Sequence, residues 1–130
     1  MNKVTYVVVP VLDEQENINL FYENFNKLSF DGVDLKLVFV DDGSKDNTPK
    51  IIEEICKKNK DVKLLQLTKN FGKEMALTAA IFELKNYDSL IFIDSDLQHP
   101  INLITELIKY WTEGNKVVAC IRKNDEKKNI

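Results

Sequence analysis

An apolar segment in the second half of the chain ends in two carboxylates, and this pair could hold a metal ion. Residues 90–93 are large and apolar, as in a strand buried on both faces of a parallel sheet, and Asp94 and Asp96 follow. In extended backbone, residues two apart point to the same side, so both carboxylates can aim at one point. At ~4 Å they repel by roughly 4 kcal/mol at an effective dielectric of about 20, which favours a cation or a shared proton. Oxygen ligands suit Mg²⁺ or Mn²⁺, and Gln98 can add a carbonyl oxygen.

The same acids have a second interpretation, as the cap of the next helix. Acidic residues that follow a strand often accept hydrogen bonds from the first turn of a helix, and Pro100 suits a first helical position. His99 is then a helix-start residue rather than a ligand. This segment alone leaves both interpretations open.

Apolar runs alternate with amphipathic segments along the whole chain. Strands are expected at residues 4–9, 35–40, 62–67, 90–93 and 117–121, and helices after Asp13, Thr48, Gly72 and Pro100. Pro10 is expected to end the hydrogen-bond ladder of the first strand. Asp13, with Glu16 three residues later, is expected to cap the first helix. The alternation predicts an α/β fold, a three-layer sandwich with a mainly parallel sheet between helices.

Composition excludes several classes of protein. The 130 residues are 44% hydrophobic, which predicts one domain with a core and a frayed tail at residues 123–130. The net charge is −3 and the basic residues are scattered, so the footprint of nucleic-acid binding is missing. Cys56 and Cys120 show neither metal spacing nor a disulfide framework, which favours a reducing compartment. The first apolar run is too short to span a membrane and lacks a cleavage-site pattern, so we expect a cytoplasmic protein.

The residues that could bind a ligand follow the predicted strands. In parallel sheets ligands bind beyond the carboxyl ends of the strands, and there lie residues 10–14, Asp41 and Asp42, residues 69–73, residues 94–98, and Arg122. Lys69, Lys73 and Arg122 can face anionic oxygens, and the helix after Gly72 offers backbone donors. Together with the acids they suit a metal-bound diphosphate. Asp41 or Asp42 can instead accept a hydrogen bond from a base or sugar.

Each of these segments also has a purely structural interpretation. Residues 42–44 are a common turn composition, and the lysines can be solvated charges. Residues 70–72 can form a turn with Phe71 in the core, and Trp111 can serve packing. Their joint placement at one edge of the sheet favours a site.

Several motifs in register carry a family resemblance. They are residues 8–10, 13–14, 40–46 (VDDGSKD), 70–73 (NFGK) and 94–100 (DSDLQHP). Together they resemble glycosyltransferase family 2, with the GT-A fold, over nearly the whole chain. The NFGKE and DLQHP segments are most similar to the polyprenyl-phosphate glycosyltransferases. Asp13, where the family usually has Asn, and Cys120, where it usually has Gly, depart from the pattern.

The resemblance implies a role for each residue at the edge. Asp94 and Asp96 would be catalytic, and with Gln98 they would hold Mg²⁺ or Mn²⁺. The nucleotide-binding set would be Pro10, Val11, Glu14, Asp41, Asp42, Lys73, Asp94 and Ser95, and the phosphate-binding set Lys69, Lys73 and Arg122. The metal would stabilise the leaving nucleoside diphosphate.

The resemblance also implies an activity and partners. The donor would be a nucleotide-diphosphate sugar, with UDP favoured over GDP, and the acceptor a polyprenyl phosphate at the cytoplasmic membrane face, as in cell-envelope glycan synthesis. The family's outcome is inversion. Relatives continue with an acceptor-binding half, so we expect a truncated GT-A domain. The alternative is a non-catalytic nucleotide-sugar-binding module.

Two further classes share the acidic chemistry but fail on placement. A phospho-receiver domain needs its acceptor Asp at the end of the third strand, where Gln66, Leu67 and Thr68 stand. A phosphatase of the haloacid dehalogenase type needs its Asp-x-Asp on the first strand, with Thr or Val at the position of Leu97.

Overall fold

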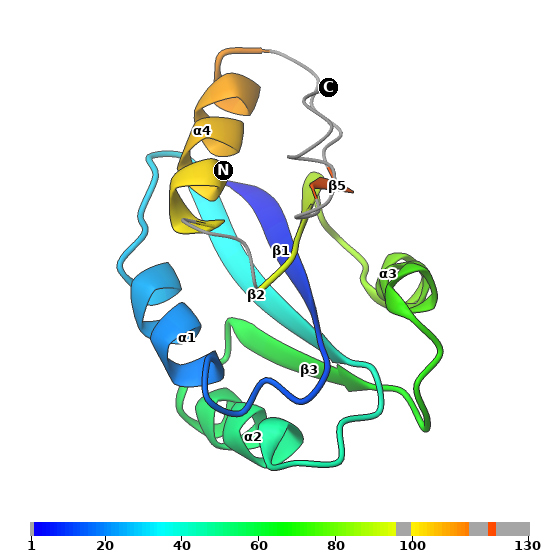
Figure 1. Cartoon of the computed structure of the whole chain (residues 1–130). Helices are drawn as coiled ribbons and strands as arrows, with labels where there is room; N and C mark the ends of the chain where they lie inside the picture. The colour runs from blue at the N-terminus through cyan, green and yellow to red at the C-terminus, as the bar shows by residue number, and fades with distance from the viewer. Residues whose placement is uncertain (1, 96–99, 115–119, 122–130) are drawn as a thin grey trace.

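The computed structural model describes residues 2–95, 100–114 and 120–121, and these form strands and helices in alternation (Figure 1). The strands are β1 (Lys3–Val11), β2 (Val33–Asp41), β3 (Val62–Gln66), β4 (Ser89–Ile93) and β5 (Cys120–Ile121). The helices are α1 (Ile18–Asn26), α2 (Thr48–Lys58), α3 (Lys73–Glu83) and α4 (Pro100–Thr112). The predicted α/β fold is confirmed.

All neighbouring strands pair in parallel, in the order β3-β2-β1-β4-β5. The chain therefore builds outward from β1 through β2 to β3, and then returns to place β4 on the other side of β1. Strand order reverses between β1 and β4, and at such a point the loops beyond the carboxyl ends diverge and leave a crevice. The loops after β1 and β4 flank this crevice.

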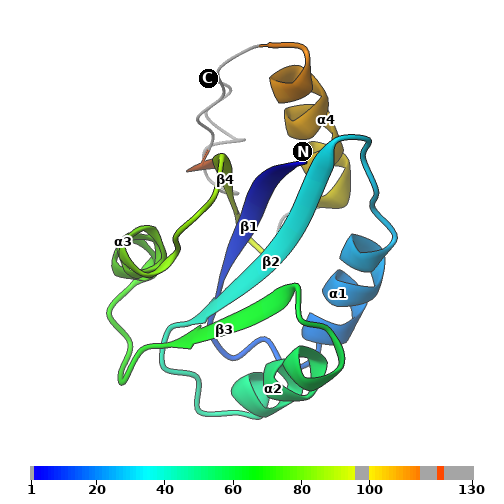
Figure 2. The same cartoon turned by 180° about the vertical axis from the view of Figure 1, so that it is seen from behind.

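Helices cover both faces of the sheet, as predicted. Helices α1, α2 and α4 lie on one face and α3 on the other, which both views show (Figures 1 and 2). Alternate residues of β1 supply the two cores, since Val7 and Val9 belong to the cluster under α1, α2 and α4, while Val8 belongs to the cluster under α3. Burial on both faces explains the near-continuous apolar runs of the strands.

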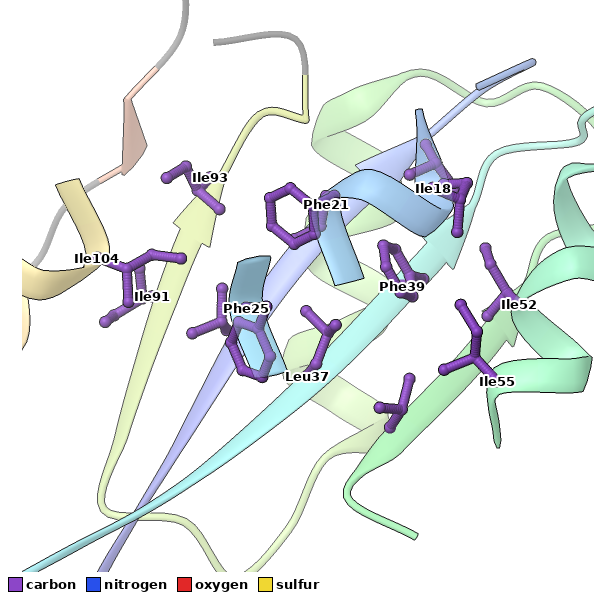
Figure 3. Packing of buried hydrophobic residues seen from close by; sticks show 14 of the residues in the cluster. Ile18, Phe21, Phe25, Leu37, Phe39, Ile52, Ile55, Ile91, Ile93 and Ile104 are labelled. Atoms are coloured by element: carbon purple, nitrogen blue, oxygen red, sulfur yellow. The ribbon is translucent and has the colours of Figure 1, made fainter. Parts of the chain in front are cut away.

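The larger core is centred on aromatic packing between α1 and β2. Phe21 and Phe39 meet edge to face with ring centroids 6.0 Å apart, and Ile52 of α2 lies on the other side of Phe39 (Figure 3). The smaller core places Ala76 and Ala80 of α3 against the sheet. These small side chains let α3 lie close to the strands.

The expectation that Pro10 ends the ladder of β1 is wrong on the β2 side. Pairing continues through Pro10 and Val40 to Val11 and Asp41. The carbonyl of Val11 accepts the N–H of Asp42, so odd-numbered residues of β1 direct their backbone groups to β2 and even-numbered ones to β4. The missing N–H of Pro10 therefore belongs to the β4 side, where pairing has already stopped at Val8.

Candidate functional site

A pocket of about 320 Å³ lies at the carboxyl edge of the sheet. Residues from four separate segments line it. Six of them belong to the predicted nucleotide-binding set, namely Pro10, Val11, Glu14, Asp42, Lys73 and Ser95. Leu12, Asn70 and Gly72 complete the lining. The parallel sheet brings these segments together because β1, β2 and β4 all end at this edge.

Asp42 holds the loop that leads into α3. The residue is 4% exposed, and its carboxylate accepts two backbone hydrogen bonds, from the N–H of Phe71 at 2.8 Å and of Gly72 at 3.0 Å. Both acceptor oxygens of a buried carboxylate are thus satisfied by protein. The carboxylate of Asp42 therefore fixes the two residues before α3 against the end of β2.

Lys73 and Asp94 form an ion pair across the edge of the sheet. The ammonium nitrogen of Lys73 lies 3.1 Å from Oδ1 of Asp94. The Asp94 side chain is 6% exposed, whereas the Lys73 side chain is 49% exposed. A buried carboxylate requires a positive or hydrogen-bonding partner, and the lysine supplies one here. The pair links the start of α3 to the end of β4.

Gly43 lets two loops approach closely. Its φ is +82°, and a Cβ at this position would lie 2.7 Å from the backbone N of Asn70 and 2.7 Å from the backbone C of Lys69. Real Cβ atoms do not come so close to backbone, and the left-handed φ also favours glycine. The turn after β2 therefore accepts glycine alone without a shift of the Lys69–Asn70 backbone.

The expectation that Asp13 caps the first helix is wrong. The cap residue of α1 is Asn17, which makes no side-chain cap hydrogen bond. Asp13 has a φ of +51°, and its Oδ1 accepts the N–H groups of Lys45 at 2.8 Å and Asp46 at 3.3 Å. Asp13 cannot cap α1, because α1 begins five residues later at Ile18, and the Asp13 carboxylate instead binds the loop after β2.

The loops after β1 and β2 are cross-linked by further side chains. The hydroxyl of Ser44 accepts the N–H of Asp13, and the hydroxyl of Thr48 accepts the N–H of Glu14, both at 2.8 Å. Asp46 accepts the N–H of Gln15 and both the N–H and the hydroxyl of Thr48. Burial alone would raise the pKa of the Asp46 carboxyl, but these hydrogen bonds outweigh it and hold that pKa below its ordinary value. This mutual bracing positions Glu14 at the pocket.

The other predicted residues lie outside the pocket lining or outside the described residues. Asp41 is buried, and its Oδ1 accepts the N–H of Ser44 at 3.2 Å. Lys69 is exposed, with its ammonium 5.2 Å from the ring centroid of Phe71. Phe71 is 44% exposed, so the alternative that placed it in the core is wrong. Asp96, Gln98, His99 and Arg122 lie outside the described residues.

Sequence reasoning missed the bracing between the first two loops. The partners are 31 to 34 residues apart in the chain. Asp13, Asp46 and Thr48 each have a local interpretation as turn or cap residues, and no spacing rule links them. Only the pairing of β1 with β2 reveals their contact.

Within the described ranges, no group of three or more His, Cys, Asp and Glu side chains could hold a metal ion. Asp94 is the one predicted metal ligand that those ranges include. Its carboxylate already faces a cation, the ammonium of Lys73, so its environment suits positive charge. No helix in the described part of the chain has both the length and the apolar character needed to cross a bilayer.

The sequence profile described as "Glycosyl transferase family 2" matches residues 6–129. The chain belongs to glycosyltransferase family 2. This confirms the resemblance inferred from the motifs. The family domain thus covers every described segment that lines the pocket.

Curated relatives of this family 2 chain include glycosyltransferases of bacteria and phages. An uncharacterized glycosyltransferase of Synechocystis is 36% identical over 119 residues, covering 91% of this chain and 37% of that protein. A prophage bactoprenol glucosyl transferase homolog of Escherichia coli is 39% identical, covering 91% of this chain and 39% of that protein. A bactoprenol glucosyl transferase of Shigella phage SfX is also 39% identical, with the same coverage. The chain thus spans somewhat over a third of the length of these relatives.

Solved structures establish the GT-A fold of this family 2 chain. A mannosyltransferase of Pyrobaculum calidifontis, in complex with GDP-Man and Mn²⁺, has a TM-score of 0.72 at 22% identity, covering 99% of this chain and 38% of that one. Residues 1–349 of TarS from S. aureus, in complex with UDP-GlcNAc, have a TM-score of 0.63 at 22% identity, covering 92% of this chain and 37% of that one.

Proposed function

We propose that this chain is the donor-binding part of a metal-dependent, inverting glycosyltransferase. One observation carries the proposal: predicted nucleotide-binding residues from the ends of β1 and β2, the start of α3 and the end of β4 line a single pocket. A nucleotide-diphosphate sugar would occupy this pocket, with UDP favoured over GDP.

Different residues would contact different parts of the donor. Pro10, Val11, Glu14 and Asp41 would lie on the nucleoside side, with Asp42 and Ser95 nearby. Lys69, Lys73 and Arg122 would face the diphosphate oxygens, because ammonium and guanidinium groups make strong charge-assisted hydrogen bonds to phosphate. Asp41 is buried and accepts the N–H of Ser44. It would therefore support the nucleoside side of the pocket by holding this turn.

The catalytic set would be Asp94 and Asp96, which with Gln98 would hold Mg²⁺ or Mn²⁺. The oxygen-only donor set fits these hard cations, and the buried Asp94 carboxylate already carries a cationic partner. When bound, the divalent ion would neutralise the charge that develops on the leaving nucleoside diphosphate. The chain's own contribution is to hold the two phosphates between this edge and the start of α3.

The acceptor would be a polyprenyl phosphate at the membrane surface. Two relatives at 39% identity carry the name bactoprenol glucosyl transferase or its homolog, which supports a lipid phosphate acceptor. A phosphate acceptor is already ionised, so attack on the anomeric carbon with inversion needs no strong general base. The alternative is a non-catalytic nucleotide-sugar-binding module.

Calorimetric titration tests donor binding. UDP and GDP are titrated into the chain with and without Mn²⁺, and binding is expected only with the metal. Asp94→Asn should weaken metal-dependent nucleotide affinity by about tenfold or more, because it removes a charged ligand. Asp61→Asn, which alters a carboxylate before β3 at the opposite end of the sheet, is the matched control and should bind as the unaltered chain does. Equal affinity of Asp94→Asn and the unaltered chain would refute the assignment.

A second measurement separates the enzyme from the binding module. Radiolabelled UDP-glucose or GDP-mannose is incubated with the chain, Mn²⁺ and undecaprenyl phosphate, and the lipid fraction is counted. Label in the lipid supports the transferase. Nucleotide binding without labelled lipid favours the module.

A further inference from the structure

The ion pair of Lys73 and Asp94 uses one of the carboxylates that would hold the proposed metal. Lys73 is the first residue of α3, and Asp94 directly follows β4, so the pair joins two elements that the sheet brings together. The separation of 3.1 Å between the ammonium nitrogen and Oδ1 is that of a direct ion pair, and the carboxylate is nearly buried. The ammonium contacts Oδ1, one of the two oxygens that Asp94 could offer to a divalent cation.

The backbone that carries Lys73 is anchored by Asp42. Asp42 accepts the N–H groups of Phe71 and Gly72, the two residues before Lys73, and thereby anchors the backbone from which the lysine extends. The Lys73 side chain remains half-exposed and lines the pocket. Its ammonium has three N–H donors and a flexible stem, so it can turn from Asp94 into the pocket while its backbone stays fixed.

We infer that Lys73 is a placeholder for the metal ion, pairing with Asp94 when the pocket is empty and transferring to the diphosphate when metal and nucleotide arrive. This inference rests on the proposed function. A divalent cation and an ammonium on one carboxylate repel each other, so binding of metal at Asp94 disfavours the contact of the lysine. A diphosphate supplies a new anionic partner for the displaced ammonium. Lys73 therefore weakens binding of metal alone and makes metal and nucleotide bind cooperatively.

The test measures the affinity of the 130-residue chain for Mn²⁺ alone and for UDP or GDP at saturating Mn²⁺. Lys73→Met keeps an apolar stem and removes the charge. It should bind Mn²⁺ alone roughly threefold to tenfold more tightly, the scale expected for loss of one partly exposed ion pair. It should bind nucleotide with Mn²⁺ roughly threefold to tenfold more weakly, through loss of one charge-assisted contact. Lys73→Arg should restore both values toward those of the unaltered chain.

Lys85→Met is the matched control, because it removes the same charge from an exposed lysine that follows α3 and lies outside the pocket lining. Its Mn²⁺ affinity should stay within about twofold of the unaltered chain, which separates the ion pair from net charge. Circular dichroism checks that each variant folds.

The two possible failures are distinguishable. In the first, the unaltered chain binds Mn²⁺ and nucleotide, but Lys73→Met binds Mn²⁺ alone no more tightly than the unaltered chain does. This result overturns the placeholder role of Lys73 and leaves the proposed function standing. Unaltered chain with no Mn²⁺-dependent nucleotide binding overturns both. A structural role for Lys73 alone would weaken both affinities together and would also overturn the inference.

Discussion

At the scale of single residues, the site depends on a few positions whose surroundings admit little change. Asp42 and Asp94 are buried carboxyl groups, and each has defined partners, backbone N–H groups in one case and a lysine in the other. Gly43 is constrained by its φ and by the backbone of the Lys69–Asn70 segment. The motif residues at this edge of the sheet therefore stabilise the loops around the pocket, in addition to any contact with a ligand.

Gly43→Ala should be destabilising for two reasons, and Gly32→Ala isolates one of them. Both glycines have left-handed φ angles, +82° and +77°, so each substitution should cost about 1–2 kcal/mol of strain. A Cβ at Gly43 would also meet backbone, which should add roughly 1–3 kcal/mol, whereas a Cβ at Gly32 meets nothing within 4 Å. Urea denaturation measures both free energies of unfolding. Equal losses in the two variants would contradict the close approach of the loops.

At the scale of elements, the loops after β1 and β2 behave as one unit. Asp13 accepts two N–H groups of the second loop, while Ser44 and Thr48 accept N–H groups of the first. These loops make up one wall of the pocket through Glu14 and Asp42. Loss of one brace should loosen that wall without affecting the cores beneath the helices.

Asp46→Asn should lower stability in a pH-dependent way. Hydrogen bonds hold the pKa of Asp46 below its ordinary value of 3.8, so the ionised carboxylate contributes stability above that pH and loses it as pH falls through the lower folded-state pKa. At neutral pH the free energy of unfolding should be about 1 kcal/mol lower for the variant than for the unaltered chain, and this difference should shrink below pH 3.8. Urea denaturation at several pH values measures this. The exposed Asp31→Asn variant serves as the control, and a deficit independent of pH would exclude the mechanism.

At the scale of the whole molecule, stability depends mainly on the core beneath α1, α2 and α4. Phe39 lies fully buried on β2, the strand between β1 and β3, and packs with Phe21 (Figure 3). The opposite face is covered by α3, whose outer side exposes Phe82. Phe39 should therefore contribute much more than Phe82 to the stability of the fold.

Phe39→Ala should lower the free energy of unfolding by roughly 3–5 kcal/mol, because it leaves a cavity in a close-packed core. Phe82→Ala removes the same atoms from a side chain that is 76% exposed, and should change stability by no more than about 0.5 kcal/mol. Thermal and urea unfolding compare the two. A similar loss in both variants would contradict the assignment of the core.

The sequence by itself determined the class of fold and the edge that carries the site. Apolar periodicity acts over a few residues, so it revealed the strands, the helices and the segments such as Asp94 that follow each strand. Strand order decided the rest, because placing β1 between β2 and β4 sets which loops touch. Two contacts join residues that lie far apart in the chain: the hydrogen bonds from the loop before α3 to Asp42, and the ion pair of Lys73 and Asp94. The continuation of β1 through Pro10 depends on which neighbouring strand each residue faces. Local pattern carries no information on such partners, and only the packed sheet brings them within reach.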